Sequence, residues 1–147
     1  MKDQLKKNER MTTILKMRKA VLENEHKKYS DLLFKKNQME QQVMEFQNSY
    51  LEGVDKVNHL RSSTERQSLS VFEDLVDHSK RNWAQCHREV SHLQNQLTLQ
   101  GKKVQEAYSS VKAAEHLKDK AWKELQSEVV RQEEFSMEDA HRWKYQS

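Results

Sequence analysis

Seven histidines and one cysteine are the residues best able to bind a metal ion or act as a nucleophile in this chain. Two metal ligands on one helix reach the same ion when they are three or four residues apart. His87 and His92 are five residues apart, and Cys86 and His87 are adjacent, so on a helix each pair diverges. The sequence therefore predicts no metal site and no cofactor.

Carboxylates are abundant, but acid–base catalysis needs a carboxyl group in a dry, concave pocket that raises its pKa. A chain of slender helices offers no such pocket. The sequence also contains no glycine-rich phosphate loop, no Gly-x-Ser-x-Gly and no Cys-x-x-Cys. We therefore predict that the protein is not an enzyme and that its carboxylates lie on solvated helix faces.

Basic residues are concentrated near the N-terminus. Residues 1–36 carry eleven Lys and Arg against five Asp and Glu, whereas residues 37–100 carry six against nine. Such an excess could face nucleic acid, an anionic membrane or an acidic protein. Acidic residues interrupt it at Glu9, Glu23, Glu25 and Asp31, which favours ion pairs between helix neighbours. We predict no nucleic-acid binding.

The composition favours a cytoplasmic protein. Cys86 is the single cysteine, so no intrachain disulfide can form, as is usual in a reducing compartment. No apolar run approaches the roughly 18 residues of a membrane span, and no apolar segment follows the basic N-terminus as it would in a signal peptide. We expect no direct membrane insertion.

A heptad pattern of apolar residues extends from Leu15 to Leu60 without a change of register. Steps of three and four residues from Leu15 reach fourteen positions, ten of them apolar or aromatic. The positions are Leu15, Arg18, Leu22, Glu25, Tyr29, Leu32, Lys36, Met39, Val43, Phe46, Tyr50, Gly53, Val57 and Leu60. Such a stripe predicts a helix that supercoils with a partner helix.

A second heptad pattern starts at Leu69. Fifteen of its twenty positions are apolar, and the exceptions gather toward its end. The positions are Leu69, Phe72, Val76, Ser79, Trp83, Cys86, Val90, Leu93, Leu97, Gln100, Val104, Ala107, Val111, Ala114, Lys118, Ala121, Leu125, Glu128, Gln132 and Phe135. The last part of this second pattern either frays or packs against a different partner.

A polar cluster, residues 61–68, separates the two patterns. Ser62 with Glu65, and Ser70 with Glu73, fit the Ser-x-x-Glu capping box at a helix start. The sequence thus predicts an all-α fold, a long antiparallel two-helix coiled-coil hairpin that forms a single domain over residues 1–147. We expect helices over 3–60 and 70–140, a turn over 61–69 and a flexible tail over 141–147. The longer second helix should project beyond the N-terminus.

Aromatic and apolar residues gather on both sides of the predicted turn. A second apolar track, Met44, Leu51 and Val54, lies next to the heptad stripe. One track faces the partner helix, and the other is either an exposed docking patch or part of a broad helix interface. The charged C-terminal part of the second predicted helix also carries large apolar and aromatic residues: Trp122, Phe135, Met137, Trp143 and Tyr145.

Several segments resemble the FliJ family of flagellar export proteins. The stretches 114–120 and 131–142 are similar to the C-terminal signature of the family, although Glu138-Asp139 stands where the family more often has Asp-Glu and His116 interrupts the first segment. The pair Phe46 and Tyr50 is similar to an aromatic pair that the family carries before its bend. The related YscO-type stalk of injectisomes shares this architecture.

The resemblance implies a central stalk of a type III export apparatus, cytoplasmic and peripheral to the inner membrane. The implied partners are a hexameric export ATPase, an export gate membrane protein and export chaperones. The residues implied to face the gate are Met39, Val43, Phe46, Tyr50, Phe72 and Val76. Those implied to face the ATPase are Lys6, Lys7, Arg10, Leu125, Arg131, Phe135 and Arg142. The alternative is a generic coiled-coil scaffold or dimerisation protein with no link to secretion.

Overall fold

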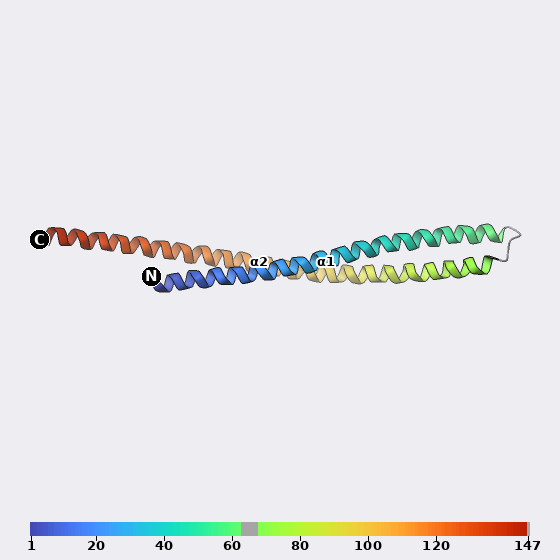
Figure 1. The fold of residues 1–147 in the computed structure, drawn as a ribbon, viewed down its shortest axis with the longest axis horizontal. Coiled ribbons are helices and arrows are strands. Elements are labelled where there is room, and N and C mark those ends of the chain that lie inside the picture. Colours follow the sequence, from blue (N-terminus) through green and yellow to red (C-terminus); the bar gives the residue numbers. More distant parts are fainter. Residues whose placement is uncertain (63–67, 147) are drawn as a thin grey trace. The chain divides into compact units, whose positions relative to one another are not determined.

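The computed structural model describes residues 1–62 and 68–146, and these residues form two α-helices (Figure 1). α1 spans Lys2–Arg61 and α2 spans Leu69–Gln146. The helices pack against each other as a helical hairpin, which confirms the all-α hairpin predicted from the two heptad patterns.

In the part of the chain that the structure describes, no helix is both long enough and apolar enough to cross a lipid bilayer.

The contacts of the chain fall into two compact units. The terminal unit comprises Met1–His26 and Lys103–Ser147, and thus contains both chain ends. The bend unit comprises Lys27–Lys102 and contains the connection between the helices. In each unit, α1 and α2 pack along a covered face. We call this face the seam.

A small apolar core holds the terminal unit together. Leu15, Val111 and Ala114 are buried, and Ile14 and Leu22 pack against them. α2 places alanines at one heptad position, Ala107, Ala114 and Ala121, and all three are buried. Their small side chains leave room for the larger apolar side chains of α1 that pack against them.

Two polar contacts show the antiparallel register of the terminal unit. Lys7 Nζ lies 3.0 Å from Glu124 Oε2, and Arg18 Nη1 donates a hydrogen bond of 3.0 Å to the backbone oxygen of Ser110. From Lys7 to Arg18 the residue number rises along α1, while from Glu124 to Ser110 it falls along α2. Pairing of this kind is the signature of antiparallel helices.

The seam of the bend unit contains larger side chains. The Tyr50 and Trp83 rings stack with centroids 5.9 Å apart and an interplanar angle of 26°. Gly53 lies opposite Val76, at a point where a Cβ atom would come within 2.7 Å of Val76 Cγ2. The helices thus approach closely at a point where one of them lacks a side chain, next to a layer of stacked aromatic rings.

The predicted heptad stripes are the covered faces of the two helices. All fourteen positions of the first stripe are buried or half-buried. So are the first eighteen positions of the second stripe, whereas Gln132 and Phe135 are exposed. Met1 lies beside Val129 and Met137 in a shared groove, so the first turn of α1 lies level with this part of α2. The residues of α1 therefore do not cover the later turns of α2.

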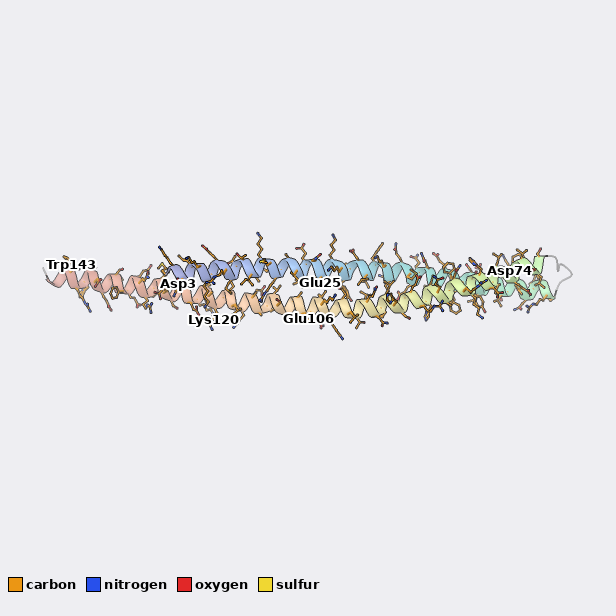
Figure 2. All side chains as sticks on the ribbon, turned by 90° about the horizontal axis from the view of Figure 1, so that it is seen from below. Asp3, Glu25, Asp74, Glu106, Lys120 and Trp143 are labelled. Atoms are coloured by element: carbon orange, nitrogen blue, oxygen red, sulfur yellow. The ribbon has the colours of Figure 1, made fainter. Side chains whose placement is uncertain are left out.

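The ends of α2 differ from those expected. The helix continues to Gln146, so residues 141–146, expected as a flexible tail, are helical. Arg142, Lys144 and Gln146 are good helix formers, and no Gly or Pro occurs among residues 141–146. Figure 2 shows Trp143 on this part of α2, past Asp3 at the start of α1.

The predicted capping box at Ser70 is wrong. Ser70 is the second residue of α2, inside the helix, and the Glu73 carboxylate instead accepts a hydrogen bond of 3.1 Å from Arg61 Nη2. The box of Ser62 and Glu65 falls on residues 63–67, which lie outside the described residues. Ser62 itself donates a 2.8 Å hydrogen bond to the His59 carbonyl at the end of α1.

Candidate functional site

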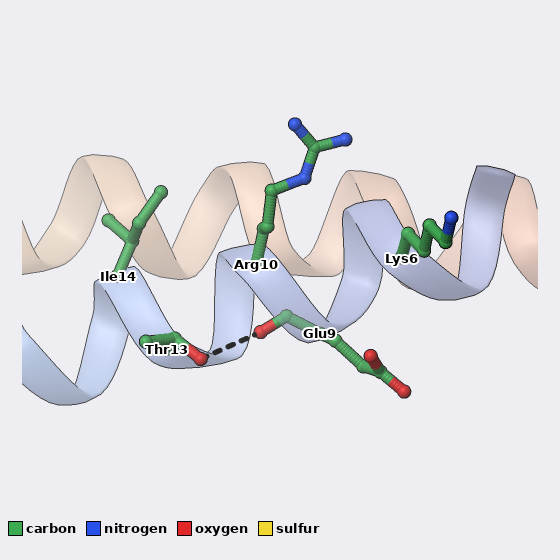
Figure 3. A pocket seen from close by; sticks show the side chains of 5 residues that line it. All are labelled: Lys6, Glu9, Arg10, Thr13 and Ile14. Atoms are coloured by element: carbon green, nitrogen blue, oxygen red, sulfur yellow. Dashed lines mark hydrogen bonds between the residues drawn. The ribbon is translucent and has the colours of Figure 1, made fainter.

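The described cavities are shallow grooves on the helix surfaces. One groove of about 570 Å³ is lined by α1 alone, by Lys6, Glu9, Arg10, Thr13 and Ile14 (Figure 3). Within this set of residues, the Thr13 hydroxyl donates a 3.1 Å hydrogen bond to the Glu9 carbonyl (Figure 3). Within the described residues, no three His, Cys, Asp or Glu side chains gather closely enough to hold a metal ion.

The six residues expected to face the export gate all lie on the seam of the bend unit. Met39, Val43, Phe46 and Tyr50 come from α1, and Phe72 and Val76 come from α2. Each is half-buried. Since they lie between the two helices, their inner sides hold the hairpin together and only their outer edges reach solvent.

Two ring contacts orient the aromatic members of this patch. Tyr50 stacks on Trp83, and Lys56 Nζ lies 5.8 Å from the centroid of the Phe72 ring. A cation over a ring face is attracted by the negative potential of the ring. Tyr50 and Phe72 therefore each have a contact that favours one orientation of the ring.

The second apolar track is the more exposed of the two. The Met44 side chain is 63% exposed and Leu51 is 52% exposed, whereas Val54 is half-buried. The structure thus assigns the heptad track to the seam and leaves Met44 and Leu51 outside it. This arrangement matches the interpretation in which one track faces the partner helix and the other is exposed.

A groove of about 300 Å³ flanks the same seam and was not expected from the sequence. Its walls come from both helices: Lys35, Gln38, Met39 and Gln42 of α1, and Glu89, His92 and Leu93 of α2. It lies beside Met39, one of the six patch residues. The sequence signal for this groove is the heptad position directly before the apolar stripe. That position carries Lys35 and Gln42 on one helix and Glu89 on the other.

Cys86 is half-buried on the seam of the bend unit. Burial raises the pKa of its thiol, and the nearby Glu89 carboxylate raises it further. A thiol with a raised pKa is a poor nucleophile because the thiolate is the reactive form. Cys86 therefore serves as a small apolar side chain of the seam.

The residues expected to face the ATPase divide into exposed and buried groups. Lys6, Lys7 and Arg10 are exposed on α1, and Arg131, Phe135 and Arg142 are exposed on α2. Leu125 is only 7% exposed, because it packs into the seam of the terminal unit. The exposed members can contact a partner directly, while Leu125 can only support them.

The uncovered part of α2 displays large apolar side chains among charges. Trp143 is 80% exposed, Met137 74% and Phe135 65%. Arg131 Nη2 pairs with Glu128 one turn earlier, so local ion pairs help this part of the helix. Exposed side chains of this size on a charged helix are typical of a protein-binding segment.

Sequence reasoning missed two residues of the terminal seam, Gln4 and Asn8. The heptad steps were started at Leu15, but the same steps taken backward reach Met11, Asn8 and Gln4. All three are half-buried. Extending the pattern toward the N-terminus would have shown two polar amides on the covered face.

Comparison with known protein families identifies a family for this chain. A family model described as "Flagellar FliJ protein" matches residues 6–141, which include most of both helices. Neither the comparison with curated proteins nor that with solved structures found a match.

Proposed function

The chain belongs to the FliJ family of flagellar proteins, and from that membership we propose that it is the stalk linking the hexameric export ATPase to the export gate. Members of this family are non-catalytic components of the flagellar export apparatus. The family match over residues 6–141 is the observation that carries the proposal. On this proposal the protein works in the cytoplasm, at the periphery of the inner membrane, and also handles export chaperones.

The terminal unit is the part proposed to contact the ATPase. It contains both chain ends, the exposed basic residues Lys6, Lys7 and Arg10, and the uncovered turns of α2. Exposed ion pairs contribute only about 0 to 1 kcal/mol each. Contacts of this kind suit a stalk that must bind a ring at many points without being trapped at one.

The bend unit is the part proposed to contact the gate. The outer edges of Phe46, Tyr50 and Phe72 are accessible, while their inner sides are fixed by the seam. Rings that are already oriented lose little conformational entropy on binding, which favours recognition. The exposed Met44 and Leu51 border this patch and enlarge the apolar surface.

The ATPase contact is tested by substitutions on the uncovered turns of α2. Phe135→Ala with Arg142→Ala should weaken binding of the chain to the purified export ATPase by about tenfold, or about 1.4 kcal/mol. Leu99→Ala with Arg88→Ala is the matched control, since Leu99 is 61% exposed and belongs to the bend unit. Equal affinities for the two double variants would argue against this contact.

The gate contact is tested by the two halves of one aromatic stack. Tyr50→Ala and Trp83→Ala each remove the stacking interaction, but only Tyr50 belongs to the proposed patch. If the patch binds the gate, Tyr50→Ala weakens binding to the soluble part of the gate protein more than Trp83→Ala does. If each variant instead weakens gate binding in proportion to the unfolding free energy that it loses, the stacked rings only stabilise the hairpin and do not contact the gate.

A further inference from the structure

The first turns of α1 cover α2 with polar side chains. Gln4 and Asn8 occupy heptad positions, and both are half-buried. Their side-chain carbonyl oxygens, Gln4 Oε1 and Asn8 Oδ1, are buried, and no described group donates a hydrogen bond to either. Turning either amide over would bury an NH₂ group in the same place. The seam therefore contains two amides that water would solvate better than α2 does.

The register shows which part of α2 these amides cover. Lys7 pairs with Glu124, and Met1 shares a groove with Val129 and Met137. Further along α1, Arg18 bonds to Ser110, so Asn8 lies just past the Lys7 contact in the direction of Ser110. In antiparallel helices Gln4 then lies beside the turn that contains Leu125, and Asn8 beside the turn that contains Ala121. Ala121 is 1% exposed and Leu125 is 7% exposed, so α1 covers both.

The next heptad of the same seam is built differently. Ala114 lies seven residues before Ala121 and is also 1% exposed. Its cover is apolar, because Leu15 packs against it in the cluster that Ile14 and Leu22 complete. Two alanines at the same heptad position, equally buried, thus lie at different levels of the seam, one in an apolar cluster and the other level with the unsatisfied amides.

We propose that residues 2–10 of α1, the N-terminal segment, detach from α2 as a unit and uncover Ala121 and Leu125 while the rest of the terminal unit stays packed. Opening returns the Gln4 and Asn8 amides to water. It loses little else that is polar, because Lys7 and Glu124 are 49% and 42% exposed, and an exposed ion pair adds little stability. This proposal does not depend on the proposed function.

Opening changes the surface that α2 presents. Trp122 follows Ala121 directly and is already 49% exposed. When the N-terminal segment detaches, Ala121 and Leu125 join Trp122 in one apolar face on a helix that remains folded. The segment thus acts as a removable cover of this apolar face.

Thiol labelling of two matched variants tests the cover. Ala114→Cys and Ala121→Cys are made separately in a Cys86→Ser background, and folding is checked by circular dichroism. We expect Ala121→Cys to react at least about tenfold faster than Ala114→Cys, since the two sites are equally buried in the closed state. Equal labelling rates would overturn the proposal.

A second pair of variants tests whether the amides cause the opening. Gln4→Leu with Asn8→Leu should slow hydrogen exchange of the amides of residues 5–12 and, in the Ala121→Cys protein, remove the excess labelling rate. Lys2→Leu with Glu9→Leu is the control, because both side chains lie exposed on the same segment. If the control slows exchange as much as the seam variant, ordinary fraying of a helix end explains the opening and the proposal fails.

Discussion

At the scale of single residues, the two glycines differ in the space that surrounds them. Both lie within helices and neither has a positive φ, so neither is needed for an unusual backbone conformation. At Gly53 an added Cβ would lie 2.7 Å from Val76 Cγ2. At Gly101 it would lie 3.7 Å from Tyr29 Cε2, an ordinary contact distance. Only Gly53 is therefore required by close helix packing.

Gly53→Ala should destabilise the protein. Val76 is β-branched and stiff in a helix, so it cannot turn away easily, and overpacking of this kind costs about 1 to 3 kcal/mol. The higher helix propensity of alanine returns about 1 kcal/mol. We expect a net loss of unfolding free energy, measured by urea unfolding followed by circular dichroism.

Gly101→Ala is the matched substitution and should stabilise the protein by about 0.5 to 1 kcal/mol in the same measurement. A loss of stability in this variant, or a gain in Gly53→Ala, would contradict the packing distances on which both expectations rest.

Cys86 should react slowly with thiol reagents. Burial and the Glu89 charge both raise its pKa, so at any given pH the thiolate fraction is smaller than in a free cysteine. The reaction rate should therefore rise with pH around a midpoint above the usual value of about 8.5. Glu89→Gln should lower this midpoint without returning it to the ordinary value, because burial remains. A midpoint at or below that of free cysteine would show that neither cause operates.

At the scale of the helices, the apolar spacing predicted the covered faces well. Every position from Leu15 to Leu60 that the heptad steps reached is covered, including the polar Arg18, Glu25 and Lys36. Polar side chains are tolerated there because neighbouring layers are apolar and long side chains can reach out of the seam. Arg18 does so by donating a hydrogen bond to the Ser110 carbonyl.

Helix ends were predicted less well, because they depend on local contacts rather than on periodicity. Glu73 was expected to cap α2, but in the structure it pairs with Arg61. Residues 141–146 were expected to be a flexible tail, but they continue α2, and no Gly or Pro among them ends the helix. The cover of Ala121 and Leu125 was missed because Gln4 and Asn8 break the apolar pattern.

The core of the terminal unit should depend on Leu15. Leu15 is 7% exposed and packs against Val111 and Ala114, so Leu15→Ala leaves a cavity and should cost about 2 to 5 kcal/mol. Met17→Ala is the control, since Met17 is 64% exposed. Thermal or urea unfolding should show a large loss for the first variant and almost none for the second. Similar losses in both would place the seam on the wrong face of α1.

The uncovered turns of α2 should contribute to binding and not to stability. Removing residues 138–147 deletes no buried side chain of the described residues, so the unfolding free energy should stay within about 0.5 kcal/mol of the full chain. Affinity for the export ATPase should fall, because Trp143 and Arg142 are lost. A truncated chain that is much less stable yet binds normally would reverse the roles assigned to this segment.

At the scale of the whole molecule, the chain is a hairpin whose contact surfaces are distributed along two helices. Its core consists of narrow seams, with few fully covered side chains and many exposed charges. Such a molecule has little enclosed space for chemistry and a large surface for protein contacts. The sequence predicted this architecture because the heptad patterns and the polar cluster between them allow few alternatives, whereas the partners came from the family resemblance.

The rate of ATP hydrolysis by the purified export ATPase, measured with and without the full chain, tests the central claim most directly. A stalk that binds the ring and promotes its assembly should raise the rate at stoichiometric concentrations, and the chain lacking residues 138–147 should raise it less. An unchanged rate at concentrations where other subunits of the export apparatus bind the chain would contradict the assignment of this hairpin as the stalk of the ATPase.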